Sequence, residues 1–125
     1  MKHQTPWGIA DSTYEIADGI LSHHTASHGG IELSPERHAA LQSKFRFHTF
    51  AGGRWYEEDC DACAVVIAFP DAFPAHKVPL AIQAAKAFLS WEQRDYTSEG
   101  KWARVLKHCR TNHFLRDHVT EVAPA

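Results

Sequence analysis

The sequence contains no long hydrophobic run and few cysteines. No stretch approaches the roughly 20 apolar residues that a membrane-spanning helix needs. The N-terminus, MKHQTPWGIADS, also has no apolar core of signal-peptide length. Its three cysteines, Cys60, Cys63 and Cys109, are too few and odd in number for the disulfide framework of a secreted protein. We therefore expect reduced thiols in a cytoplasmic protein that does not contact membranes.

Motifs that specify a reaction are also missing. The chain has no phosphate-binding glycine loop, no G-x-S-x-G and no H-E-x-x-H, so nucleotide hydrolases, serine hydrolases and metalloproteases have no motif here. No motif indicates a cofactor. The net charge of −2 argues against direct nucleic-acid binding, although basic and aromatic residues alternate over 44–50 and leave stacking on single strands as an alternative.

What is present indicates one domain over residues 1–125. The chain is 44% hydrophobic and 22% charged, as in ordinary globular proteins. The turn signals Asp18-Gly19 and His28-Gly29-Gly30 separate three β-compatible segments, YEIA, GILSHHT and GIELS. Glycine supplies the positive φ angles of tight hairpins, so these segments predict two or three short antiparallel strands.

Helix signals follow the predicted strands. Ser34 as N-cap and Pro35 at the first helical position predict a helix from residue 35 to about 43, before an irregular connection over 44–54. The apolar run CAVVIAF predicts a helix from about 59 to 69, stopped by Pro70, with a buried strand as the alternative.

The C-terminal part predicts further helices. One spans 79 to about 94, and another begins at Ser98 with the apolar stripe Trp102, Val105, Leu106 and Cys109. The last segment, HFLRDHV, fits a short helix or a returning strand. We predict an α+β fold, with a small N-terminal antiparallel sheet packed against three to four helices and residues 96–125 as a helical extension.

Two charged clusters are candidate binding surfaces. Acidic residues before the CAVVIAF run suit the positive end of a helix dipole, and Asp59 or Asp61 could cap that helix. The same stretch could also contact a partner, together with a basic ridge that ordinary solvated helix surface would equally explain. The predicted binding residues are Trp55, Tyr56, Glu57, Glu58, Asp59 and Asp61, with Lys101, Arg104 and Lys107 forming the ridge.

Cys60 and Cys63 have the C-x-x-C spacing of redox and zinc sites. The neighbouring acids would raise the pKa of a thiol, which argues against disulfide exchange. Zinc would need two more ligands, and the nearest candidates are His108, Cys109 and His113. We interpret the pair as two small, partly buried helix residues and assign no metal site.

His28 is the candidate catalytic residue. A histidine beside Gly29-Gly30 lies where backbone amides are exposed, and Glu58 or Asp59 could orient it or hold a divalent ion. That arrangement is the minimum for acid-base chemistry and predicts, as the alternative function, a small hydrolase-type enzyme. A hydrogen-bonded turn histidine next to a helix cap explains the same residues without catalysis.

Four motifs carry a resemblance to a known family: TPWG, TASHGGIELSPER, WYEEDCD and AFPDAF. Over residues 5–95 the chain resembles a family of uncharacterised proteins from phages, prophages and plasmids of proteobacteria. The resemblance implies an accessory protein in the host cytosol that blocks a host protein or ribonucleoprotein complex, as anti-CRISPR and anti-restriction proteins do. Occlusion needs no bond-making residue, so we favour a binding protein over an enzyme.

Overall fold

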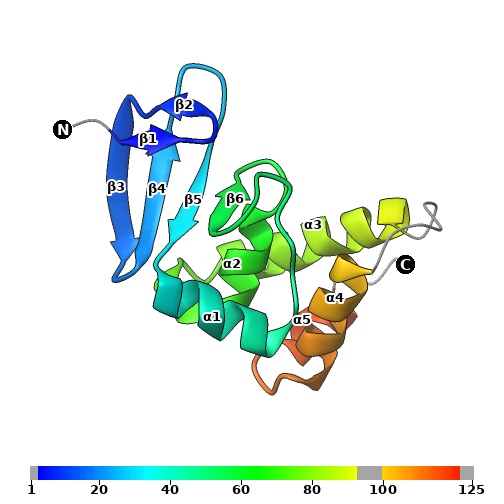
Figure 1. The fold of residues 1–125 in the computed structure, drawn as a ribbon. Helices are drawn as coiled ribbons and strands as arrows, with labels where there is room; N and C mark the ends of the chain where they lie inside the picture. Colours follow the sequence, from blue (N-terminus) through cyan, green and yellow to red (C-terminus); the bar gives the residue numbers. More distant parts are fainter. Residues whose placement is uncertain (1–2, 93–99, 122–125) are drawn as a thin grey trace.

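The computed structural model describes residues 3–92 and 100–121, and it contains an antiparallel sheet of four strands in chain order. Tight turns connect the first three strands, and the fourth arrives after a helix and a long connection. Figure 1 shows this sheet at one side of the molecule. The strands are β3 (Ser12–Ala17), β4 (Ile20–His24), β5 (Gly29–Leu33) and β6 (Trp55–Glu57).

A two-stranded hairpin is formed by β1 (Gln4–Thr5) and β2 (Gly8–Ile9). It lies across the half of the sheet that is nearer the turn between β4 and β5 (Figure 1). Trp7 lies in its turn and meets Trp55 of β6 edge to face, with ring centroids 5.9 Å apart. The hairpin therefore covers part of one face of the four-stranded sheet.

Five α-helices occur within the described residues and pack together beside the sheet (Figure 1). A 3₁₀ turn, η1 (Pro70–Ala72), joins the second helix to the third. The predicted α+β class is confirmed. The helices are α1 (Pro35–Lys44), α2 (Ala62–Ala68), α3 (Lys77–Glu92), α4 (Lys101–Thr111) and α5 (Arg116–Glu121).

Local signals located several helices well. Ser34 caps α1 by accepting the amide of Arg37 at 3.1 Å, with Pro35 in the first turn, as predicted. The CAVVIAF run is helical, so its strand alternative is wrong, and HFLRDHV contributes to helix α5. The predicted helix limits Arg94 and Ser98 lie outside the described residues.

The two faces of the sheet differ in polarity. On one face Ile20, Leu33 and Tyr56 are fully buried in the core, which continues through the helices. On the other face the register aligns Thr13 with His23, beneath the hairpin.

Among the described residues, no helix is long and apolar enough to span a bilayer.

Candidate functional site

His28 lies at the turn between β4 and β5, and Thr25 fixes its backbone. The Thr25 amide donates to the His28 carbonyl at 2.8 Å, and the Thr25 hydroxyl donates to the same oxygen. The His28 amide donates back to Thr25 Oγ1 at 3.1 Å. This closed turn holds the histidine at the edge of the sheet, with its imidazole exposed.

The end of β6 is joined directly to that turn. Glu57 pairs with Gly30 of β5, and the Glu58 amide donates to the Gly29 carbonyl at 3.0 Å. The chain then turns sharply, with the Cys60 amide donating to the Glu57 carbonyl at 3.2 Å. Backbone hydrogen bonds therefore fix the position of the end of β6 relative to Gly29 and to His28, which precedes it.

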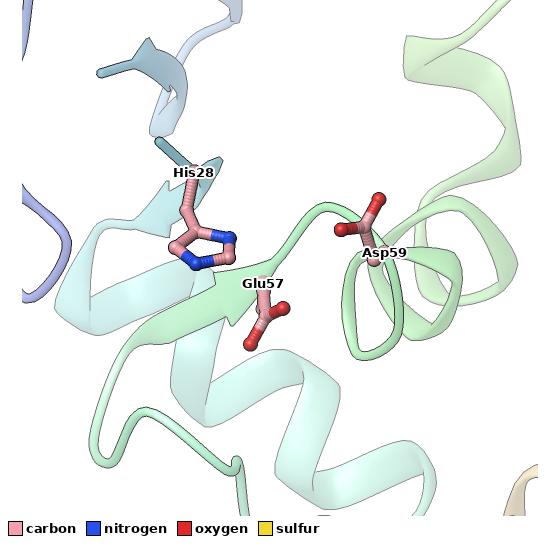
Figure 2. A group of neighbouring side chains, drawn as sticks. All are labelled: His28, Glu57 and Asp59. Atoms are coloured by element: carbon pink, nitrogen blue, oxygen red, sulfur yellow. The ribbon is translucent and has the colours of Figure 1, made fainter. Parts of the chain in front are cut away.

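These two turns bring His28, Glu57 and Asp59 together. Each offers one nitrogen or oxygen atom, and the three atoms all lie within 4.8 Å of one another (Figure 2). Metal bonds to such atoms measure about 2.0–2.2 Å, so ligands of a shared ion lie at most about 4.4 Å apart. His28 and Asp59 are exposed and Glu57 is half-buried, so these side chains have room to rotate toward a shared ion.

Comparison with protein families shows which family the chain belongs to. Residues 1–118 match a domain of unknown function, DUF7007. The chain belongs to this family. No curated protein and no solved structure matches the chain. The match confirms that the resemblance leads to an uncharacterised family, and it assigns no role to any residue.

The structure separates the acidic residues that the sequence groups together. Glu58 was predicted to pair with His28, but its side chain lies on the opposite side of β5 from Glu57. There it lines an apolar groove with Ser22 and Ile31. The reason is strand alternation, because successive side chains at the end of β6 point to opposite faces.

Two predicted binding residues are interior instead. Tyr56 is fully buried, and this burial raises the pKa of its phenol. Its hydroxyl lies 2.9 Å from His38 Nδ1. Asp61 is also fully buried and does not cap α2 with its side chain. Neither residue can contact a partner at the surface, because the packing of β6 and α2 against the core encloses both.

The carboxylate of Asp61 ties three segments together. It accepts the Phe50 amide at 2.7 Å and the Lys101 ammonium at 3.0 Å. The Lys101 nitrogen also donates to the His48 carbonyl and lies 4.6 Å from the centre of the Phe47 ring. Lys101 is only 14% exposed, so it belongs to the interior rather than to a basic ridge.

The remaining members of the predicted ridge also differ from one another. Arg104 donates through Nε to the Arg46 carbonyl at 2.7 Å, whereas Lys107 is exposed on the same helix. Trp55 is half-buried beside Trp7. The predicted surface is therefore split between interior contacts and separate exposed residues.

The cysteines have thiols of high pKa. Burial, reinforced by the charge of Asp61, raises the pKa of Cys60 to about 11, and burial raises that of Cys109 to about 12. The pKa of Cys63 is raised as well, mainly by burial. All three are free, and the candidate ligand group in the described chain includes none of them. Thiolate chemistry at neutral pH is therefore disfavoured.

Sequence reasoning missed a buried polar cluster around His23. Its Nδ1 lies 2.8 Å from the Thr13 hydroxyl and its Nε2 lies 3.0 Å from a Glu32 oxygen, while the ring packs against His3 and Trp55. His23 is fully buried. The alternating pattern of β3, β4 and β5 was the available signal, because it places Thr13 and His23 on one face.

Proposed function

We propose that this protein binds a divalent metal ion through His28, Glu57 and Asp59 and uses it for hydrolysis. The observation that supports the proposal is the convergence of the three ligand atoms within 4.8 Å. They come from two chain segments that backbone hydrogen bonds join at Gly29. Because the backbone sets their relative positions, the ion would have to organise only three side chains.

The ligand chemistry suits Zn²⁺ or Mn²⁺. One imidazole nitrogen and two carboxylate oxygens form a mixed set that both ions accept. Three protein ligands leave a coordination position for water, and a bound metal lowers the pKa of such a water to about 7. At this exposed edge a substrate can approach the ion without opening the fold. Metal-assisted hydrolysis is the reaction class that follows.

Metal titration of single variants tests the proposal. Calorimetric titration of the protein with ZnCl₂ and MnCl₂ should show one saturable site. Metal binding should become at least about tenfold weaker in each of three variants, His28→Ala, Glu57→Gln and Asp59→Asn. Loss of a group that only hydrogen-bonds to a metal ligand already has an effect of about this size, so loss of a ligand should have at least as much. Glu58→Gln is the matched control, because this carboxylate is the next in the chain and faces the other way.

Two results would contradict the metal site. One is a wild-type protein that binds neither ion more tightly than about 1 mM. The other is a Glu58→Gln variant that loses as much affinity as Glu57→Gln, because this would indicate general attraction of cations to acidic surface. Hydrolysis is tested separately, by incubating the zinc-loaded protein with p-nitrophenyl ester and phosphodiester substrates and asking whether product exceeds protein.

Blocking of a host defence complex is a second candidate, favoured by one exposed aromatic residue. Trp91 is 71% exposed and lines a groove with Phe88 and Lys101. Exposed tryptophans in such settings are frequent anchors of protein interfaces. Together with the resemblance to proteins of mobile elements, this supports a protein that binds a host protein or ribonucleoprotein complex in the cytosol.

A plaque assay separates the two candidates. If the protein blocks a defence system, its expression in a strain whose CRISPR–Cas system targets a phage should raise plaque numbers. Trp91→Ala should reverse that effect, whereas His28→Ala should retain it. Plaque numbers that do not rise with the wild-type protein would count against this activity.

A further inference from the structure

The strand β3 forms one edge of the four-stranded sheet. Within the described residues it pairs with β4 alone, and Figure 1 shows it at the outer side of the molecule, away from the helices. Its pairing with β4 is regular from Ser12 to Glu15 and shifts register after that residue. The free side of an edge strand presents backbone amides and carbonyls to which one more strand can bond.

An apolar groove of about 700 Å³ adjoins this edge. Tyr14 and Ile16 of β3 line one side of it, and its other side includes Phe73 and Leu80, from η1 and α3 and the residues beside them. Tyr14 and Leu80 are 54% and 56% exposed, although both are large apolar side chains. Exposed apolar surface that several elements share is typical of an interaction site.

The groove also contains a polar group that an occupant can bond. Ser22 of β4 pairs in register with Tyr14 and lines the groove, and it is only 8% exposed. Its hydroxyl makes no hydrogen bond to any described residue. The Tyr14 ring is held beside it by stacking on His24, with the ring centroids 5.8 Å apart.

The opposite face of β3 is acidic. Strand alternation places Glu15 on the face opposite to Tyr14. Glu15 is exposed and forms no ion pair with any described residue. From residue 3 to residue 36 the chain has five acids and no lysine or arginine. The free edge of the sheet therefore lies in a region of negative potential.

These features specify the side chains of an added strand, which would alternate between the two faces. On one face they would contact Tyr14 and Ile16, which favours apolar residues. The groove carries one base, Lys77, and one acid, Glu58, so it adds no net charge to that preference. On the other face they would lie beside Glu15, which favours lysine or arginine, because opposite charges on neighbouring strands attract.

A second copy of the chain fits this edge poorly. Two β3 strands side by side would bring together Asp11 and Glu15 of both copies, and no strand of the sheet contains a lysine or an arginine to neutralise them. Like charges on neighbouring strands are destabilising. The complementary occupant is a basic segment of a different protein.

We infer that β3 binds an extended segment of a partner protein, in which basic and apolar residues alternate, as an added strand of the sheet. His28, Glu57 and Asp59 neither belong to β3 nor line the groove, so this surface is independent of the proposed metal site. It can be present whether or not the protein is a hydrolase.

Titration with synthetic peptides tests the inference. The peptide KVKVKVK, with both termini capped, should bind saturably and more tightly than about 1 mM. The block peptide KKKKVVV has the same composition but cannot separate basic from apolar side chains between two faces. It should bind at least about tenfold more weakly, the effect of removing one valine from an apolar site.

Charge reversal at the edge provides the matched variants. Glu15→Lys should weaken binding of KVKVKVK by about two- to thirtyfold, because it replaces an attraction by a repulsion, and should strengthen binding of EVEVEVE. Glu36→Lys is the control, since it changes the charge of the protein equally at an exposed position of α1 outside the groove.

Hydrogen exchange measured by NMR locates the bound peptide. KVKVKVK should slow exchange of amides in β3, because an added strand accepts their hydrogen bonds. Amides of β5 should keep their rates, since this strand already pairs with a neighbour on each side.

Four outcomes would overturn the inference. The first is that KVKVKVK binds no more tightly than about 1 mM, or binds without slowing exchange in β3. The second is equal binding of the alternating and block peptides. The third is equal weakening by Glu15→Lys and Glu36→Lys, which would indicate general ionic attraction. The fourth is dimerisation of the protein alone with slowed exchange in β3, which would make the occupant a second copy. Circular dichroism of each variant checks that loss of binding is not loss of fold.

Discussion

Gly30 is the second residue of β5 and lies where there is no room for a side chain. A Cβ at this position would stand 2.5 Å from the Tyr56 carbonyl oxygen and would also meet the Trp7 ring. The ring can move, but the carbonyl belongs to the paired strand and cannot. We expect Gly30→Ala to lower the free energy of unfolding by about 1–3 kcal/mol, as overpacking does in tight interiors.

Urea unfolding checks this expectation, with Ser27→Ala as the control because Ser27 is exposed in the neighbouring turn. A Gly30→Ala variant as stable as the wild type would mean that β6 or the hairpin shifts easily. In that case the pairing that positions Glu57 beside His28 would also be loose.

Asp61 is the acidic residue whose removal should cost the most stability. Asp61→Ala leaves the Lys101 ammonium without its carboxylate and the Phe50 amide without its acceptor. Breaking such a buried pair costs about 3–5 kcal/mol, and we expect the lower end because the His48 carbonyl still accepts from Lys101. Glu58→Ala, at an exposed position, should change the free energy of unfolding by less than about 0.5 kcal/mol.

Thermal and urea unfolding of the two variants measure the difference. Equal destabilisation by Asp61→Ala and Glu58→Ala would contradict the structural role of Asp61. It would also support the interpretation, made from the sequence, of one continuous acidic surface.

The acidic stretch shows what the sequence could and could not establish about single residues. That His28 could meet an acidic residue near position 59 was expected, and the structure brings Glu57 and Asp59 to it. Sorting Glu57 from Glu58 required knowing that β6 is a strand, because only strand alternation sends them to opposite faces. Burial of Asp61 depends on Lys101, forty positions along the chain, which no local pattern reveals.

At the scale of helices and strands, elements with local causes were predictable. The start of α1 depends on Ser34, Pro35 and one amide three residues away, and the β3–β4 turn depends on Gly19, whose φ is 82°. In contrast, β6 has three residues and exists because β5 offers a partner edge. The hairpin of β1 and β2 was not predicted, because strands of two residues are too short to show a hydrophobic pattern of their own.

The connection over 44–54 was expected to be irregular. Lys44 is the last residue of α1, and Gln42 of the same helix gives the rest of the connection its shape. Gln42→Ala removes both hydrogen bonds to Phe47, so we expect the free energy of unfolding to fall by about 1–3 kcal/mol. The Phe47 amide should then exchange with deuterium about 5- to 140-fold faster, because each 1.4 kcal/mol corresponds to a factor of ten.

Hydrogen exchange measured by NMR tests this expectation at the residue concerned. Gln83→Ala, at an exposed position of α3, should leave exchange at Phe47 unchanged. If the Phe47 amide stayed equally protected in Gln42→Ala, then packing of the Phe47 ring, and not Gln42, would hold the connection.

For the molecule as a whole, ten histidines in 125 residues make the pH dependence of stability a test of the packing. Burial and the charge of Arg54 lower the pKa of His38, and burial and the charge of Lys44 lower that of His108. The unfolded chain binds protons at these positions near the ordinary value of 6.5, while the folded protein does not until the pH is lower. Protons therefore favour the unfolded state below that value.

We expect the stability contributed by neutral His38 and His108 to be complete above pH 6.5 and to be lost progressively as the pH falls below it. Urea midpoints measured from neutral to mildly acidic pH should decline, and the double variant His38→Gln, His108→Gln should decline less steeply. His76→Gln, at an exposed position before α3, should retain the wild-type slope. If the double variant kept the full slope, other groups would control the loss of stability in acid. Protonation of His38 beside Tyr56 of β6, and of His108 beside Phe45, would then cost the folded protein no stability.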